Sequence, residues 1–71
     1  MFELANLGKL IADLRKRRGL TQEALAGLTE MDRSYISEIE NGRKNLSVVS
    51  LVRIANALEE KPGRLLDLSF S

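Results

Sequence analysis

Paired carboxylates are the groupings in this sequence that come nearest to a catalytic arrangement. The chain has neither histidine nor cysteine, which removes the commonest general base, disulfides and zinc-finger ligands. Glu38 with Glu40, and Glu59 with Glu60, are better interpreted as solvated helix surface. The segment GRKN at 42–45 has too few glycines for a phosphate-cradling loop. We therefore expect no enzyme activity, no metal site and no cofactor.

Basic residues are clustered rather than abundant. The chain has eleven Lys and Arg residues and ten Asp and Glu residues, and its net charge of +1 is too small to indicate nucleic-acid binding by itself. The cluster at 15–18 is either a solvated helix end, favoured by the helix dipole, or a functional patch, and both interpretations stay open. Arg43 and Lys44 directly follow a predicted helix with a polar outward face, so we expect them to contact phosphates.

Helix boundaries are marked by three N-capping signals. Thr21, Asp32 and Ser47 can each accept a hydrogen bond from an unpaired backbone N–H, and apolar residues flank each cap at the spacing of a hydrophobic staple. Pro62 suits the first position of a further helix. Together with the apolar periodicity, these signals predict one all-α domain (1–71) with helices over 3–18, 21–28, 32–41 and 47–58 and a fifth from residue 62.

Apolar residues of the last two predicted helices exceed what one small core requires. Five residues belong to the core in any interpretation, namely Leu25, Ile36, Ile39, Leu51 and Leu58. A domain of this size is marginally stable alone, and dimerisation is a common remedy. We expect some of the surplus to form a two-fold dimer interface, drawn from Val49, Val52, Leu65, Leu66 and Phe70. The alternative is that the fifth helix folds over the first and hides them.

Three segments resemble the phage-repressor (Cro/cI-like, XRE-type) family of DNA-binding proteins, namely LTQEALA, SYISEIENG and SLVRIANAL. The resemblance covers roughly residues 10–68 and implies a five-helix, lambda-repressor-like domain whose helix-turn-helix occupies about 21–42. Within the family, DRSYIS followed by ENGRKNLSV is most similar to the controller proteins of restriction–modification systems. The resemblance implies a homodimeric, sequence-specific transcriptional regulator that binds a pseudo-palindromic operator in double-stranded DNA. The similarity to controller proteins suggests that it regulates its own short operon, and both repression and activation are compatible with the resemblance.

The family also implies which residues meet DNA, because its recognition helix presents N-terminal residues to base edges in the major groove. Base contacts are expected from Arg33, Ser34, Ser37 and Glu38. An arginine can hold guanine O6 and N7 in a bidentate pair. Glu38 either accepts from a cytosine amine or pairs with a nearby arginine.

Contacts to the DNA backbone are expected on both sides of that helix, from Gln22, Tyr35, Arg43, Lys44, Asn45 and Ser47. Gln22 lies at a helix N-terminus, where outward-pointing N–H groups favour a phosphate. Asn45 and Ser47 could make a second clamp, and Ser47 could cap its helix at the same time. Tyr35 could instead pack at the edge of the motif.

Glu30 departs from the family pattern, which usually has glycine at this position of the turn. Family geometry places that residue in a left-handed conformation, which a residue with a Cβ resists. Either the turn opens slightly here or Glu30 carries strain.

No apolar run is long enough to span a membrane and no signal peptide is apparent, so we expect a cytoplasmic protein without membrane association. No small-molecule ligand is expected. The main alternative to a regulator is a protein-interaction module, such as the antitoxin of a toxin–antitoxin pair. A purely structural helical domain would leave Arg33 and the basic loop unexplained.

Overall fold

The computed structural model describes residues 3–69, and within that range the chain forms five helices and no strands. The helices are α1 (Leu4–Arg17), α2 (Gln22–Thr29), α3 (Arg33–Glu40), α4 (Val48–Ala57) and α5 (Pro62–Ser69). The prediction of a five-helix, all-α fold is confirmed. Each predicted boundary lies one residue or less from the observed one. Most of these differences arise because the capping residues flank the helices instead of belonging to them, while α2 continues one residue further than predicted, to Thr29.

Two of the three predicted N-caps form their side-chain hydrogen bond. Thr21 accepts from the backbone N–H of Ala24 at 3.0 Å, and Ser47 accepts from that of Ser50 at 3.0 Å. Asp32 has the extended backbone of an N-cap residue, but its side chain makes no capping bond. The start of α3 therefore depends more on packing than on a local cap.

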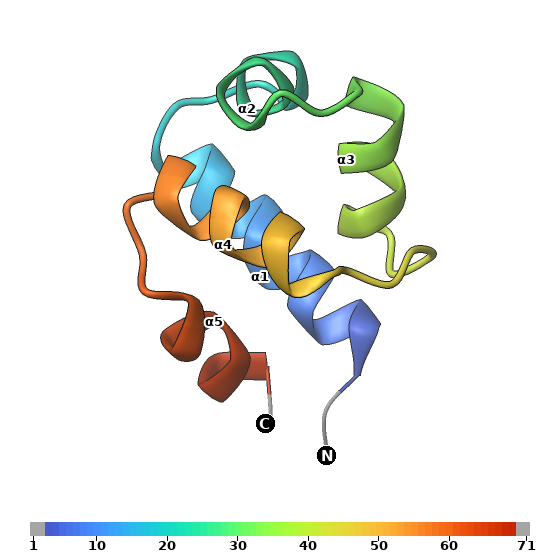
Figure 1. Cartoon of the computed structure of the whole chain (residues 1–71), viewed down its shortest axis with the longest axis vertical. Coiled ribbons are helices and arrows are strands. Elements are labelled where there is room, and N and C mark those ends of the chain that lie inside the picture. Colours follow the sequence, from blue (N-terminus) through green and yellow to red (C-terminus); the bar gives the residue numbers. More distant parts are fainter. Residues whose placement is uncertain (1–2, 70–71) are drawn as a thin grey trace.

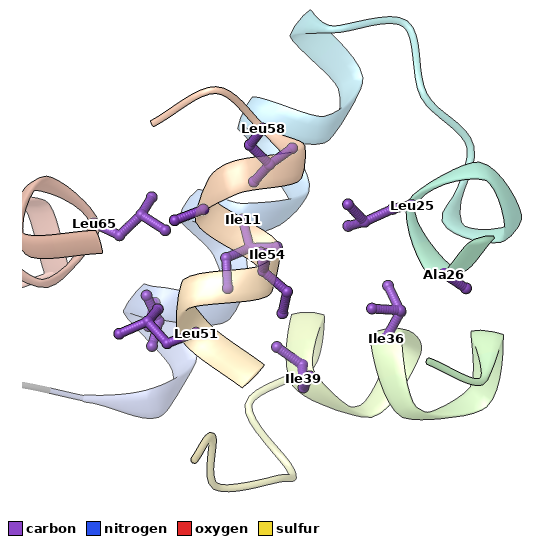
Figure 2. Packing of buried hydrophobic residues seen from close by; sticks show 11 residues of the cluster. Ile11, Leu25, Ala26, Ile36, Ile39, Leu51, Ile54, Leu58 and Leu65 are labelled. Atoms are coloured by element: carbon purple, nitrogen blue, oxygen red, sulfur yellow. The ribbon is translucent and has the colours of Figure 1, made fainter. Parts of the chain in front are cut away.

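The core is a single apolar cluster to which all five helices contribute (Figure 2). Ile11 of α1 and Ile54 of α4 are completely buried near its centre, and the core residues predicted from the sequence are all buried. The cluster consists of Leu7, Ile11, Leu25, Ala26, Ile36, Ile39, Leu51, Ile54, Ala55, Leu58 and Leu65.

Leu65 corrects one part of the predicted dimer interface. Its side chain is 0% exposed, because α5 packs against both α1 and α4 and inserts this residue between them. A side chain without exposed surface in one chain cannot cover a second chain, so the prediction for Leu65 was wrong. Val49, Val52 and Leu66 do keep exposed surface. Phe70 lies outside the described residues.

The helices are arranged so that α2 and α3 lie together at one end of the molecule and α5 lies at the other (Figure 1). Between them, α1 contacts α3 and α5, while α4 contacts α2 and α5. The α2–α3 pair is thus supported from behind by two helices, and the outer side of α3 is left uncovered within residues 3–69. None of the helices described is long and apolar enough to cross a membrane.

Candidate nucleic-acid interface

The turn between α2 and α3 has a tight left-handed geometry. Glu30 has φ 59° and ψ 36°, and the next N–H, of Met31, donates to the carbonyl oxygen of Ala26 at 2.9 Å. The turn has not opened to relieve the Cβ of Glu30, so of the two possibilities raised by the sequence, the strained one holds. Residues 30–32 then lead directly into α3.

The outward side of α3 is polar and accessible. Arg33, Ser34 and Glu38 are exposed and Ser37 is half-buried, while Ile36 and Ile39 are buried on the opposite side. Within the described range Glu38 makes no ion pair, so the alternative of an arginine partner finds no support there. The four predicted base-contacting residues therefore share one helix and lie away from the core.

Residues predicted to hold the DNA backbone lie on both sides of α3. Arg43, Lys44, Asn45 and Ser47 are exposed in the loop that leads to α4. This loop starts with a tight turn at Gly42 (φ 71°), after which the N–H of Arg43 donates to the carbonyl oxygen of Glu38 at 2.9 Å. The turn fixes the basic loop directly beside the last turn of α3.

Tyr35 and Gln22 are less accessible than the other predicted backbone contacts. Tyr35 is half-buried and packs against the apolar cluster, in agreement with the edge-packing alternative. Gln22, at the first position of α2, is also half-buried, and its amide donates through Nε2 to Glu40 Oε1 at 3.0 Å. Neither side chain points freely to solvent, which distinguishes both from the loop residues.

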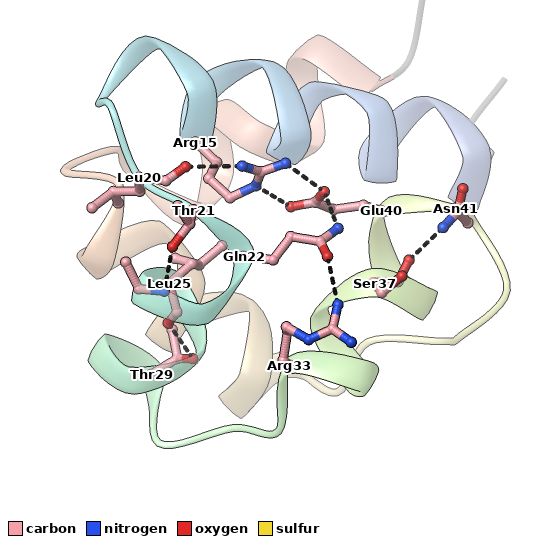
Figure 3. A network of polar contacts seen from close by, with 11 residues as sticks. Arg15, Leu20, Thr21, Gln22, Leu25, Thr29, Arg33, Ser37, Glu40 and Asn41 are labelled. Carbon is pink, nitrogen blue, oxygen red and sulfur yellow. Dashed lines mark hydrogen bonds and ion pairs between the residues drawn. The ribbon is translucent and has the colours of Figure 1, made fainter.

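An ion pair inside the domain holds α1 against the end of α3 (Figure 3). Arg15 Nε donates to Glu40 Oε2 at 2.7 Å and Nη2 donates to Oε1 at 3.1 Å, while Nη1 donates to the carbonyl oxygen of Leu20 at 2.8 Å. The two side chains are only 11% and 6% exposed. The interpretation of Glu40 as solvated surface was therefore wrong. Of the two interpretations left open for the cluster at 15–18, the solvated helix end does not hold for Arg15, which is buried.

The electrostatics of this pair follow from its geometry. Hydrogen bonds from the guanidinium to the Glu40 carboxylate, together with the opposite charge, raise the pKa of Arg15 above its ordinary value, although burial acts in the opposite direction. Removing one partner of such a pair leaves an uncompensated buried charge and typically costs about 3–5 kcal/mol. The ion pair thus fixes α1, the loop before α2 and the end of α3 relative to one another.

Helical spacing contains a signal that each of these two side chains is buried, although it does not show that they are partners. Arg15 lies four residues after the buried Ile11, and Glu40 lies four residues after the buried Ile36. Each charged residue therefore continues an apolar stripe, where an unpaired charge would be costly. The described residues contain no group of three or more acidic side chains placed to hold a metal ion.

An exposed helix supported by a second helix across a tight turn defines a helix-turn-helix unit, and comparison with known proteins agrees. The sequence pattern of the helix-turn-helix family matches residues 11–65. The control protein C.MunI of a Mycoplasma species is 42% identical over 52 residues, which are 72% of this chain and 70% of that protein. The control protein C.BamHI of Bacillus amyloliquefaciens is 35% identical over 63 residues, covering 87% and 78% respectively.

A solved structure shows the same arrangement. The restriction–modification controller protein C.AhdI from Aeromonas hydrophila superposes with a TM-score of 0.85 at 40% identity, covering 87% of this chain and 94% of that one. The chain therefore belongs to the helix-turn-helix family and is a DNA-binding transcriptional regulator, as its resemblance to phage repressors and controller proteins implied. These relatives support the regulator over the alternative of an interaction module such as an antitoxin.

Proposed function

We propose that this protein is a homodimeric regulator of the controller type, which binds a pseudo-palindromic operator near its own gene in the cytoplasm. Sequence-specific DNA recognition is supported by the exposed polar side of α3, where the side chains of Arg33, Ser34 and Glu38 lie on the solvent side of the helix, away from the core. Arg33 lies at the N-terminal end of the helix, the end that approaches base edges in this class of motif. The basic loop beside it would hold phosphates.

The division of labour between these residues follows from their chemistry. Base edges carry the sequence information, and a guanidinium can hold guanine O6 and N7 together. Phosphates carry no sequence information. Contacts to them would set the affinity of the protein for DNA and its position along the duplex, and we assign these contacts to Arg43, Lys44, Asn45 and Ser47. Within one chain the base-reading helix is short, which limits the number of base pairs that it can distinguish. A second copy would double the site.

Support for the second copy comes from apolar side chains that remain exposed on two contacting helices. Val49 is 62% exposed, and Val52 and Leu66 are each 36% exposed, although the domain already has a complete core. A group of exposed apolar side chains marks an interaction site more often than a single exposed apolar residue does. Here it would bring two chains together, and two-fold symmetry of the dimer would give the operator its pseudo-palindromic form.

The test is selection of bound duplexes from random DNA, followed by titration of the best sequence and of its scramble. We expect a pseudo-palindrome whose half-sites are about 34 Å apart. DNA from upstream of the protein's own gene should compete as well as the selected duplex if the protein regulates its own operon. If no selected duplex bound better than its scramble, sequence-specific recognition would be excluded.

A further inference from the structure

Asn41 and Gly42 form an asparagine–glycine pair at the end of α3, between the proposed recognition helix and the basic loop. Asn41 is exposed and follows the last residue of the helix, while Gly42 is half-buried. An asparagine followed by glycine loses its side-chain amide especially readily, because glycine has no Cβ to obstruct attack by its backbone nitrogen. None of the DNA contacts proposed above uses this pair.

The fold requires glycine at position 42. A Cβ built there would lie 2.8 Å from the Cα of Ala5 in α1 and 3.1 Å from the backbone nitrogen of Ala5. Gly42 also has φ 71°, a conformation that residues with a side chain resist. Asn41 has a negative φ and makes a structural contact of its own, because Nδ2 donates to the carbonyl oxygen of Ser37 at 2.8 Å (Figure 3). The packing of α1 thus keeps an asparagine at position 41 next to the residue that favours loss of its amide.

We propose that Asn41 is a site of spontaneous deamidation, which removes free protein from the DNA-binding pool and spares protein bound to its operator. The backbone nitrogen of Gly42 gives its proton to hydroxide and attacks Cγ of Asn41. The Cγ–Nδ2 bond then breaks, ammonia leaves with a proton from water, and a five-membered succinimide remains. Water opens this ring at either carbonyl, which gives aspartate or isoaspartate. The protection by DNA rests on the proposed contacts of α3 and the basic loop.

The closed turn controls when this reaction can occur. Asn41 has ψ 5°, and ring closure requires this angle to rotate so that the nitrogen of Gly42 faces Cγ. Three hydrogen bonds oppose the rotation, namely Asn41 Nδ2 to the Ser37 carbonyl oxygen at 2.8 Å, Gly42 N–H to that of Ile39 at 3.0 Å, and Arg43 N–H to that of Glu38 at 2.9 Å. Helix ends open locally at much lower free energy than the whole fold. A duplex held by α3 and by the loop should keep the turn closed and slow the reaction.

Both products are expected to weaken DNA binding. Aspartate at position 41 cannot donate to the Ser37 carbonyl oxygen, and it places a negative charge at the C-terminal end of a helix, where the dipole disfavours it. The same charge lies next to Arg43, which we expect to contact a phosphate. Isoaspartate adds one methylene to the main chain within the turn that fixes the basic loop. Since these effects concern phosphate contacts, they should lower the affinity for every duplex alike.

The reaction is measured by incubating the protein in mildly alkaline buffer and mapping its peptides by mass spectrometry, with chromatographic separation of aspartate and isoaspartate. Asn45 is the internal control, because it is exposed in the same loop but is followed by Leu46, whose side chain hinders ring closure. We expect most of Asn41 to be converted before Asn45 gives measurable product. A cognate duplex at about ten times its Kd should slow the conversion of Asn41 about tenfold, the factor by which free protein is depleted.

The outcomes separate failure of the modification site from failure of the proposed function. Conversion of Asn41 no faster than that of Asn45 would overturn the inference. A cognate duplex that bound without slowing the conversion would overturn the protection of bound protein. If Asn41 were converted quickly but no duplex bound better than its scramble, the proposed function would fail and the modification site would stand.

Two variants test the consequence of the reaction. Asn41→Asp is one of its products, and Asn41→Gln keeps an amide donor but would have to close a slower, six-membered ring. Asn41→Asp should bind cognate and scrambled duplexes about two- to fivefold more weakly, and the loss should shrink at high salt. Incubated wild-type protein should lose binding in proportion to its conversion, whereas incubated Asn41→Gln should keep it. Equal losses for the wild type and Asn41→Gln, or full affinity of the converted protein, would show that deamidation does not control DNA binding.

Discussion

Gly8 of α1 lies directly against the main chain of Ile39 in α3. A Cβ built at Gly8 would clash with the carbonyl oxygen of Ile39 and would come within 2.8 Å of that of Glu40. These carbonyl groups belong to the last turn of α3 and cannot move aside as a flexible side chain could. The absence of a side chain at Gly8 therefore sets how closely α1 packs against α3, the proposed recognition helix.

Gly8→Ala should accordingly destabilise the protein. We expect the free energy of unfolding to fall by about 1–3 kcal/mol, the usual cost of forcing extra volume into a packed contact. That cost exceeds the gain of about 0.5–1 kcal/mol from placing alanine instead of glycine in a helix. Urea denaturation at fixed protein concentration provides the measurement, since any dimerisation would make stability depend on concentration.

Gly27 in α2 provides the matched control for this prediction. It is also a helical glycine, but a Cβ there would meet nothing within 4 Å. Gly27→Ala should therefore raise the free energy of unfolding by about 0.5–1 kcal/mol. If the two substitutions changed stability in the same direction, close packing of α1 on α3 would not be the reason for glycine at position 8.

The sequence could predict features that depend on neighbouring residues, but not those that depend on contacts between residues far apart in the chain. Thr21, Ser47 and Pro62 act within one helical turn, so the helix boundaries followed from them and were confirmed. The contact of Gly8 with Ile39, and the ion pair between Arg15 and Glu40, join residues far apart in the chain. Their partners become apparent only once α1 is placed across α3.

In the α4–α5 region, too, the sequence alone could not predict which apolar residues would be buried. Leu65 and Leu66 are adjacent and both strongly apolar, yet one is buried and the other keeps 36% of its surface exposed. Helical periodicity predicts that neighbouring residues point in different directions, but which of them faces the core depends on how α5 docks on α1 and α4. The roles of individual residues in DNA binding remain predictions.

Glu30→Gly should stabilise the fold by about 1 kcal/mol, because glycine adopts the observed left-handed backbone without a Cβ penalty. Glu30→Ala is the matched control, since it removes the same carboxylate but keeps the Cβ. We expect the alanine variant to melt near the wild type and the glycine variant to melt higher. Equal melting temperatures for the two variants would mean that the left-handed backbone at this position carries no measurable cost.

The dimer hypothesis leads to a prediction on assembly. Val52→Glu combined with Leu66→Glu should yield monomers, because each substitution places a charge on apolar surface that association would bury. The wild type should sediment as a dimer at concentrations on the order of 10 µM. Leu28→Glu, at an exposed leucine of α2, introduces a similar charge elsewhere and should leave the dimer intact. A monomeric wild type at that concentration would contradict the dimer hypothesis. If the Leu28→Glu variant dissociated as the double variant did, the effect of the added charges would be non-specific.

Arg33 and Arg43 should contribute to DNA binding in different ways, although both are exposed arginines close to α3. Arg33 begins the helix that would enter the major groove, so Arg33→Ala should cost about 1–3 kcal/mol on the cognate duplex and far less on random DNA. Arg43 follows the turn at Gly42 and would meet a phosphate, which carries no sequence information. Arg43→Ala should therefore weaken both duplexes alike and reduce the salt slope by about one unit.

A paired titration of each variant on cognate and scrambled duplexes at several salt concentrations measures both effects at once. The affinity ratio between the duplexes reports base reading, and the slope of log affinity against log salt reports the number of neutralised phosphates. Each arginine serves as the control for the other, because both substitutions remove one positive charge. If Arg33→Ala lowered the salt slope as much as Arg43→Ala did and left the affinity ratio unchanged, Arg33 would be a second phosphate contact. The sequence would then have to be read by other residues of α3, with Ser34 and Glu38 the next candidates, since both are exposed on the same helix.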